Sequence, residues 1–289
     1  MVFLPKVNPV LLTLIHCDQC GHELAEQEGA LRCEHCERVV PLQDEVPVFT
    51  PAPEGLQPSE KLARGPEIGT PWRRANWGFL ERQTAALGPG AIILDVGAGR
   101  GDFAELFQGR NYLALDVYPY PEVDIACDLT QSNPFREASL DAILLMNVLE
   151  HVYDTHALLE ALARALKPGG ELICAIPFLV KMHQEPVDYV RYTHYALERL
   201  GPQHGLELEL LEGYYDPISL LGEGTGNLKW AVLPETHGLR HYAGRFLLAG
   251  MELMASALGR LTGPGSLRPP QAARSHAPTG YHVVYRKTS

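Results

Sequence analysis

The sequence lacks a long hydrophobic run. None of its 289 residues lies in an uninterrupted apolar stretch of about 18 residues, the length that a membrane-spanning helix needs. The apolar segment 10–15 is too short for the core of a signal peptide and leads into a cysteine cluster instead of a cleavage site. We therefore expect a cytoplasmic protein without a transmembrane segment, and contact with a membrane surface stays open.

Basic residues are also scarce. The chain has 24 Lys and Arg against 35 Asp and Glu, a formal net charge of −11. Broad electrostatic binding to nucleic acid needs a basic face. This balance disfavours nucleic acid as a partner, although an acidic protein can still carry a local basic patch.

The cysteines are too few and too clustered for a disulfide framework. Four of the six form two Cys-x-x-Cys turns, whereas Cys127 and Cys174 stand alone. In a reducing compartment this pattern indicates a metal site and two separate thiols. We expect a small metal-binding module over residues 1–50.

The two turns supply four thiolates, the tetrahedral set that Zn²⁺ prefers. Because four ligands leave no open position, we expect a structural zinc site that stabilises a module with little core of its own. Iron in a rubredoxin-like site and metal-free thiols are the alternatives. The ligands are Cys17, Cys20, Cys33 and Cys36.

A proline-rich segment, residues 51–70, reads as an exposed linker to a larger domain over residues 71–289. In that domain apolar strands alternate with helices, which predicts an α/β fold with a parallel sheet. The expected strands are 91–96, 112–117, 123–127, 140–147, 171–176, 206–212 and 280–286, and the expected helices include 72–87, one beginning at 103–108, and 155–166.

A long insertion, about 216–279, separates the last two strands. It contains one strongly apolar helix, 242–261, which we expect to be buried in the core. A cap over an acceptor pocket, a homodimer interface and a membrane-surface contact are the other uses that such a helix allows.

A glycine-rich loop follows the first strand of the large domain. Its sequence, Leu-Asp-Val-Gly-Ala-Gly-Arg-Gly over 94–101, places glycines where the backbone must turn sharply and approach a ligand. The Gly-x-Gly-x-Gly spacing differs from the Gly-x-Gly-x-x-Gly of dinucleotide sites. Asp116 ends the second strand, where a carboxylate can bind both hydroxyls of a ribose.

Residues 91–200 resemble the class I S-adenosylmethionine (SAM)-dependent methyltransferases, specifically their type 11 branch. Five segments carry the resemblance: the glycine loop, Ala-Leu-Asp-Val with Asp116, Ile-Ala-Cys-Asp-Leu with Asp128, Asn-Val-Leu-Glu-His-Val at 147–152 and Leu-Lys-Pro-Gly-Gly at 166–170. The family implies a Rossmann-like, seven-stranded, mostly parallel sheet in the order 3-2-1-4-5-7-6, with strand seven antiparallel.

The resemblance also implies roles for individual residues toward SAM. The three loop glycines line its methionine end, Asp116 binds the ribose, and Asp128 and Leu129 contact the adenine. Asp95 orders the loop and reaches the methionine amino group through water, and Leu149 packs near the cofactor. The loop glycines are Gly97, Gly99 and Gly101.

The N-terminal module, from the cysteine turns through residue 49, resembles the Trm112-like zinc-ribbon family. In that family the module occurs beside a methyltransferase, as a partner or as a fused domain. Stabilisation, a lid over the site and contact with the substrate are three roles that the sequence does not separate.

The segment after the fifth strand, 176–193, is rich in His, Asp, Arg and Tyr at the edge of the sheet where an acceptor should bind. It resembles a pattern of bacterial type 11 methyltransferases, many of them in cell-surface sugar or lipid pathways. His183 is the first candidate for the base that removes a proton, and His151 is the second. Asp188 and Arg191 would orient the base or bind a polar acceptor; a structural ion pair is the alternative.

These features favour an enzyme that transfers a methyl group from SAM to a small-molecule, sugar or lipid-linked acceptor, at oxygen. A methyltransferase for rRNA or tRNA, with the ribbon as a substrate module, is a second hypothesis. A non-catalytic scaffold or methyltransferase activator is a third.

Overall fold

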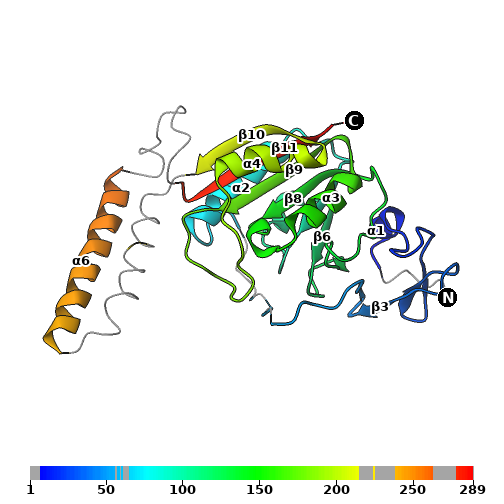
Figure 1. Ribbon diagram of the computed structural model, residues 1–289, viewed down its shortest axis with the longest axis horizontal. Coiled ribbons are helices and arrows are strands. Elements are labelled where there is room, and N and C mark those ends of the chain that lie inside the picture. Colours follow the sequence, from blue (N-terminus) through cyan, green and yellow to red (C-terminus); the bar gives the residue numbers. More distant parts are fainter. Residues whose placement is uncertain are drawn as a thin grey trace.

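The computed structural model describes residues 7–214, apart from 56, 59 and 61–64, together with residues 224, 238–262 and 278–288. A four-stranded sheet lies near the N-terminus and a seven-stranded sheet forms the centre of the molecule (Figure 1). Within the described residues, no helix is long and apolar enough to cross a membrane.

The large sheet has the order β7-β6-β5-β8-β9-β11-β10. The strands from β7 to β9 run parallel, and β11 is antiparallel to both of its neighbours, β9 and β10. Counted along the chain from β5, this is the predicted order 3-2-1-4-5-7-6, which is confirmed. The strands are β5 (Ile92–Val96), β6 (Asn111–Asp116), β7 (Ile125–Ala126), β8 (Leu140–Met146), β9 (Leu166–Pro177), β10 (Leu206–Tyr214) and β11 (Gly280–Lys287).

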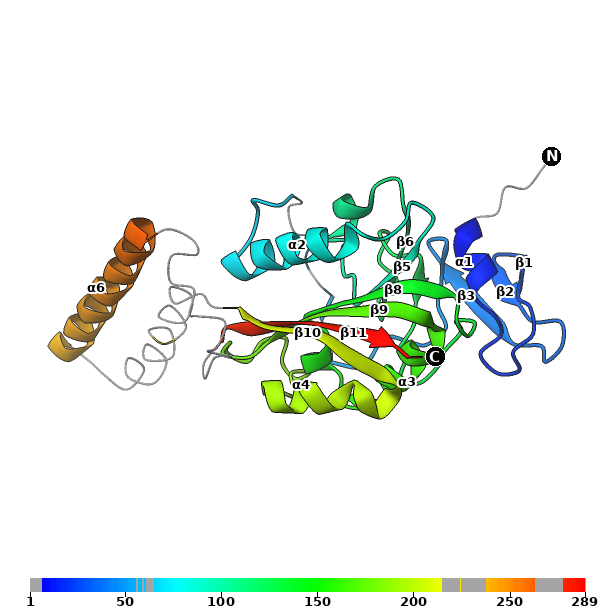
Figure 2. The same ribbon diagram turned by 90° about the horizontal axis from the view of Figure 1, so that it is seen from above.

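Helices cover both faces of this sheet. Because successive side chains of a strand point to opposite faces, Ile93 and Ile173 pack with helix α2 (Pro71–Thr84), whereas Leu94 and Leu172 belong to the core cluster of α3 (Thr155–Ala165) and α4 (His194–Leu200). Figure 2 shows α2 on one side of the sheet and α3 and α4 on the other. Such strands are buried on both faces and read as continuous apolar runs.

Each of these helices begins at a side chain that caps its first turn. Thr70, Asp154 and Thr193 each accept a hydrogen bond from a backbone N–H of the helix that follows. Such caps satisfy N–H groups that have no partner within the helix. The caps fix where α2, α3 and α4 start.

Several predicted elements have different lengths in the structure. The helix expected to begin at 103–108 is only a short 3-10 helix, Ala104–Phe107. The third strand is limited to Ile125–Ala126, and just before it the Asp124 carboxylate accepts a hydrogen bond from the N–H of Ala114 in β6. Strand β9 starts at Leu166 and includes the Lys-Pro-Gly-Gly turn.

The N-terminal module contacts the large sheet at β7. Val48 pairs with Ala126 of β7, and Ile15 pairs with Phe135. Leu11, Leu31 and other module side chains belong to the same buried cluster as the methyltransferase-like core. The elements of the module are α1 (Pro9–Leu14), β1 (Ala25–Gln27), β2 (Ala30–Arg32), β3 (Val39–Gln43) and β4 (Val46–Pro47).

The apolar helix of the insertion, α6 (Leu239–Thr262), stands apart from the sheet (Figure 1). The prediction that it is buried in the core is wrong for most of its described side chains. Among the side chains of this helix that the structure describes, Leu248 alone is buried. The large exposed ones are Tyr242, Phe246, Leu247, Leu253 and Met254.

Candidate functional site

The glycine loop turns directly after β5. Gly97 has φ of 73°, and a Cβ there would lie 2.5 Å from Cγ2 of Val148. Its N–H donates to the carbonyl of Leu115 over 2.8 Å, which draws the loop against β6. A side chain at this position would therefore be strained in its backbone and would clash, so glycine is required for the close approach.

Asp116, at the end of β6, connects to the same loop. Its Oδ2 accepts from the N–H of Gly99 over 2.8 Å, and its Oδ1 accepts from the N–H of Tyr118 over 3.1 Å. Burial raises the pKa of this carboxyl above its ordinary value. Each oxygen still has a second lone pair, so the carboxylate can accept two further hydrogen bonds from a ligand's hydroxyl groups.

A cavity of about 390 Å³ opens at the carboxyl ends of β5, β6 and β8. This volume lies in the range of small-molecule and cofactor sites. Six of the predicted site residues line the cavity: Gly97, Gly99, Asp116, Asp128, Leu129 and His151. Six further residues line the cavity although no individual role was predicted for them from the sequence: Leu115, Val117, Tyr118, Tyr120, Asn147 and Val148.

Three other residues predicted to bind the cofactor lie behind the cavity wall. Asp95 is 2% exposed and accepts a hydrogen bond from the Tyr112 hydroxyl over 2.7 Å; burial raises its pKa to about 7. Gly101 donates to the Ala98 carbonyl within the loop. Leu149 is fully buried in the main core cluster. None of the three is among the residues that line the cavity.

The N-terminal module supports the wall at Asp128. The backbone N–H of Asp128 donates to the hydroxyl of Thr50 over 2.7 Å, and the Asp128 carboxylate accepts from Thr130 and Gln131. A residue of the predicted linker, Pro53, also lines the cavity. Module, linker and sheet edge therefore form one wall together.

The segment after β9 is held by an ion pair. Arg191 donates to both carboxylate oxygens of Asp188, and this pairing lowers the pKa of Asp188 to about 2. The same carboxylate accepts from the backbone N–H of His183 over 2.8 Å. Asp188 and Arg191 are not among the residues that line the cavity. Their contacts position the loop that carries His183.

His151 and His183 converge on Glu150, in the short 3-10 helix Leu149–His151 that follows β8. The Nε2 atoms of His151 and His183 lie 3.6 Å and 3.8 Å from Oε1 of Glu150. The Glu150 side chain is 0% exposed, and burial raises its pKa to about 8. Glu150 was not predicted to be a site residue, although Glu150 directly precedes His151 in the sequence.

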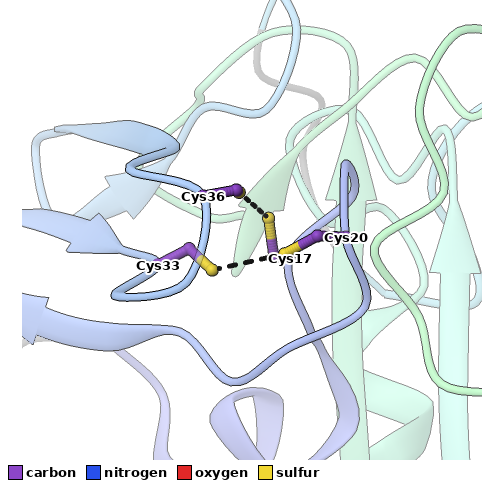
Figure 3. A group of neighbouring side chains, drawn as sticks. All are labelled: Cys17, Cys20, Cys33 and Cys36. Carbon is purple, nitrogen blue, oxygen red and sulfur yellow. Dashed lines mark hydrogen bonds between the residues drawn. The ribbon is translucent and has the colours of Figure 1, made fainter.

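The four cysteines of the module form a compact cluster, in which the turn of Cys17 and Cys20 lies beside the turn of Cys33 and Cys36 (Figure 3). Sγ of Cys17 lies 3.4 Å from Sγ of Cys36, and Sγ of Cys20 lies 3.5 Å from Sγ of Cys33. Sulfurs that bind one Zn²⁺ at about 2.3 Å in a tetrahedron lie about 3.8 Å apart. The cluster therefore fits a tetrahedral metal site after a small outward shift of the sulfurs.

Residues 72–212 match the sequence model of a family described as "Methyltransferase domain". This part of the chain is a class I SAM-dependent methyltransferase domain. Its N-terminal limit nearly coincides with the start of α2, and its C-terminal limit falls within β10. The matched segment thus contains the glycine loop, Asp116 and the Glu150 cluster.

Three relatives illustrate the similarity. An "Uncharacterized methyltransferase" of Mycobacterium sp. (strain JLS) is 30% identical over 40% of this chain and 52% of its own length. A "Ubiquinone biosynthesis O-methyltransferase" of Xanthomonas axonopodis pv. citri (strain 306) is 33% identical over 38% of this chain and 51% of its own. The chain spans about half the length of these two relatives. The solved structure of the 1,6-didemethyltoxoflavin-N1-methyltransferase of Burkholderia thailandensis, with 18% identity, covers 76% of this chain and 79% of its own at a TM-score of 0.45.

Proposed function

We propose that the protein transfers a methyl group from SAM to an oxygen of a small-molecule, sugar or lipid-linked acceptor. The observation that carries the proposal is the cavity that Gly97, Gly99 and Asp116 line at one end and His151 lines at another. The name of the Xanthomonas relative, an O-methyltransferase, supports oxygen as the acceptor atom.

The chain's own residues fit a nucleoside-containing cofactor. The carboxylate of Asp116 is positioned by Gly99 and Tyr118 to accept from ribose hydroxyls, and the Asp128–Leu129 segment forms the wall assigned to the adenine. SAM, when bound, supplies a methyl group that is activated on a sulfonium sulfur. The task of the protein is then to align the acceptor, exclude water and remove a proton.

The wall around His151 is assigned to the acceptor. Val187 and Tyr189 lie on the same wall, and the N–H of Tyr189 donates to the carbonyl of Glu150 over 2.8 Å, which fixes the loop against the 3-10 helix. His183 remains the first proposed base and His151 the second. Both rings lie beside a buried carboxylate that would stabilise a proton taken from the acceptor.

We also propose that Cys17, Cys20, Cys33 and Cys36 hold a structural Zn²⁺. Backbone N–H groups, that of Cys36 first and then that of His35, lower the pKa of the Cys33 thiol to about 7, which favours the thiolate that a metal needs. In this proposal residues 1–50 are a zinc ribbon, 51–70 a linker, and 71–289 the methyltransferase domain with its insertion at about 216–279. The contacts of Thr50 and Val48 give the ribbon the role of supporting the cofactor wall.

The test is methyl transfer itself. Protein, SAM carrying a labelled methyl group and a panel of sugars, phenols and lipid-linked hydroxyl compounds are incubated, and S-adenosylhomocysteine and labelled product are measured. We expect stoichiometric formation of both with one acceptor class, and loss of turnover in His151→Ala. Product methylated only at nitrogen or carbon would refute the assignment of oxygen.

A further inference from the structure

The cluster of Glu150, His151 and His183 lies at the acceptor wall but is not explained by hydrogen bonding. We propose that these three side chains form a binding site for one divalent transition-metal cation, separate from the four-cysteine cluster. One nitrogen from each imidazole and one carboxylate oxygen lie within 4.8 Å of one another. Two imidazoles and a carboxylate are a donor set for Zn²⁺, Mn²⁺ or Fe²⁺.

The first support is a buried carboxylate without a partner. Within the described part of the chain, neither carboxylate oxygen of Glu150 has a hydrogen-bond partner, and the same is true of Nε2 of His151. A carboxylate removed from water without compensation is costly, so it is normally paired or coordinates a metal. Its separations from the two imidazoles, 3.6 Å and 3.8 Å, exceed hydrogen-bonding distance. The three groups therefore converge without hydrogen-bonding to one another.

The second support is the orientation of the two imidazoles. Nδ1 of His151 lies 2.6 Å from the carbonyl oxygen of Val187, and Nδ1 of His183 lies 3.2 Å from that of Lys181. A carbonyl oxygen can only accept, so both Nδ1 atoms carry the proton and both Nε2 atoms present a lone pair. These lone pairs lie on the side of Glu150. Histidine ligands of metals are held in this way by a carbonyl or carboxylate behind the ring.

A second carboxylate lies behind the His183 ring, as is common for histidine ligands of metals. Asp188 Oδ2 lies 3.4 Å from Nδ1 of His183 and is itself held by Arg191. Bonds of about 2.1 Å to one cation would separate neighbouring ligand atoms by about 3.0–3.4 Å. The separations of the two Nε2 atoms from Oε1 of Glu150, 3.6 Å and 3.8 Å, exceed this by a few tenths of an ångström, and the three ligand atoms all lie within 4.8 Å of one another.

The cation would lie behind the wall of the cavity. Of its three ligands, His151 alone is among the residues that line the cavity, the Glu150 side chain is 0% exposed, and Nε2 of His151 is buried. A metal there would hold the His151 ring and the loop of His183 in fixed positions at the acceptor wall. This role, unlike the metal site itself, rests on the proposed methyl transfer. In the metal-bound form His151 and His183 are ligands, so their assignment as bases applies to the form without this metal.

The experiment measures binding directly and needs no acceptor. Folded full-length protein is first loaded with one equivalent of Zn²⁺ per chain, which four thiolates bind in preference to two imidazoles and a carboxylate, and excess Zn²⁺ is removed. Mn²⁺ is then titrated in, and free Mn²⁺ is read from its six-line electron paramagnetic resonance signal. Mn²⁺ is a hard cation that does not compete for a thiolate site. We expect one bound Mn²⁺ per chain in the wild type, and affinity reduced by at least about tenfold in His183→Ala and in Glu150→Gln.

His204→Ala is the matched control, because His204 also lies beside a histidine, with its Nε2 2.9 Å from Nδ1 of His156, outside the cluster. Its affinity for Mn²⁺ should equal that of the wild type. The proposal is overturned if the zinc-loaded wild type binds no Mn²⁺. It is also overturned if His183→Ala, a change at a partly exposed side chain, binds Mn²⁺ as well as the wild type. SAM binding, measured on the same samples, reports separately on the proposed function, so the two can fail independently.

Discussion

The Asp116 carboxylate accepts a hydrogen bond from the backbone N–H of Gly99 over 2.8 Å. This bond joins the end of β6 to the loop after β5, so a carboxylate that lines the cavity also fixes the glycine loop. The two features that define the cofactor end of the cavity are thus physically coupled. A change in either should alter both the shape of the loop and its affinity for the nucleoside.

Gly97→Ala tests how tightly this loop is packed. The new Cβ would lie 2.5 Å from Val148 Cγ2, at a φ of 73° that side chains rarely adopt. We expect a loss of about 1–3 kcal/mol in the free energy of unfolding and much weaker SAM binding. The double variant with Val148→Ala should recover part of the loss, since it removes the clash and leaves the backbone strain. Gly90→Ala, where no atom lies within 4 Å, is the control in urea denaturation.

Thr50→Val tests whether the ribbon supports the cofactor wall. The variant removes the hydroxyl that accepts from the N–H of Asp128 and leaves that N–H unsatisfied, at a cost of about 1–3 kcal/mol. We expect a lower melting temperature and weaker SAM binding. Thr13→Val, whose hydroxyl contacts only its own helix, should leave SAM affinity unchanged.

Removal of metal from the four-cysteine cluster should act in the same direction. A chelator strong enough to strip zinc should destabilise the module and weaken SAM binding through the contacts of Val48 and Thr50. Both effects should reverse when Zn²⁺ is restored. If the stripped protein binds SAM as tightly as the loaded protein, the ribbon does not support the cofactor site.

His282 gives the fold a dependence on pH. It is 5% exposed, stacks on Phe79 and Trp72, and its Nε2 lies 2.9 Å from Oδ1 of Asn76. Burial lowers its pKa to about 3. Between pH 6.5 and about 3 the ring takes up a proton in the unfolded chain but stays neutral in the folded protein. The free energy of unfolding is therefore greatest above pH 6.5 and falls as the pH is lowered toward 3.

The matching measurement compares urea denaturation of the wild type and of His282→Phe at pH 7 and at pH 4.5. We expect the wild type to lose about 2–3 kcal/mol more than the variant over this interval, at about 1.4 kcal/mol for each pH unit below 6.5. Phe keeps the stack and cannot take a proton. Equal losses in the two proteins would show that His282 does not carry this dependence.

The order of the seven strands was predicted from the resemblance to a family and is confirmed. The glycine loop and Asp116 were predicted from two short segments, and both line the cavity. The roles of the individual site residues stay predictions. Glu150 was missed because its significance depends on tertiary structure. Its side chain is fully buried, and a loop distant in sequence brings Nε2 of His183 to 3.8 Å from Oε1 of Glu150.

Other features depend on tertiary structure that no short segment encodes. The apolar composition of α6 is compatible both with a helix buried in the core and with a helix whose apolar surface is exposed. The structure shows the second arrangement at Phe246, which is 83% exposed. The docking of the ribbon on β7 rests on pairings between segments more than 70 residues apart, such as Thr50 with Asp128, where the hydrogen bond spans 78 positions.

Calorimetric titration with SAM and with S-adenosylhomocysteine tests the central claim most directly. Wild type, Asp116→Asn and the surface control Glu137→Gln are compared, each confirmed as folded. We expect micromolar binding in the wild type and the control, and affinity at least about tenfold weaker in Asp116→Asn because the ribose hydroxyls lose a charged acceptor. Absence of binding in the folded wild type, or equal affinity in all three proteins, would contradict it.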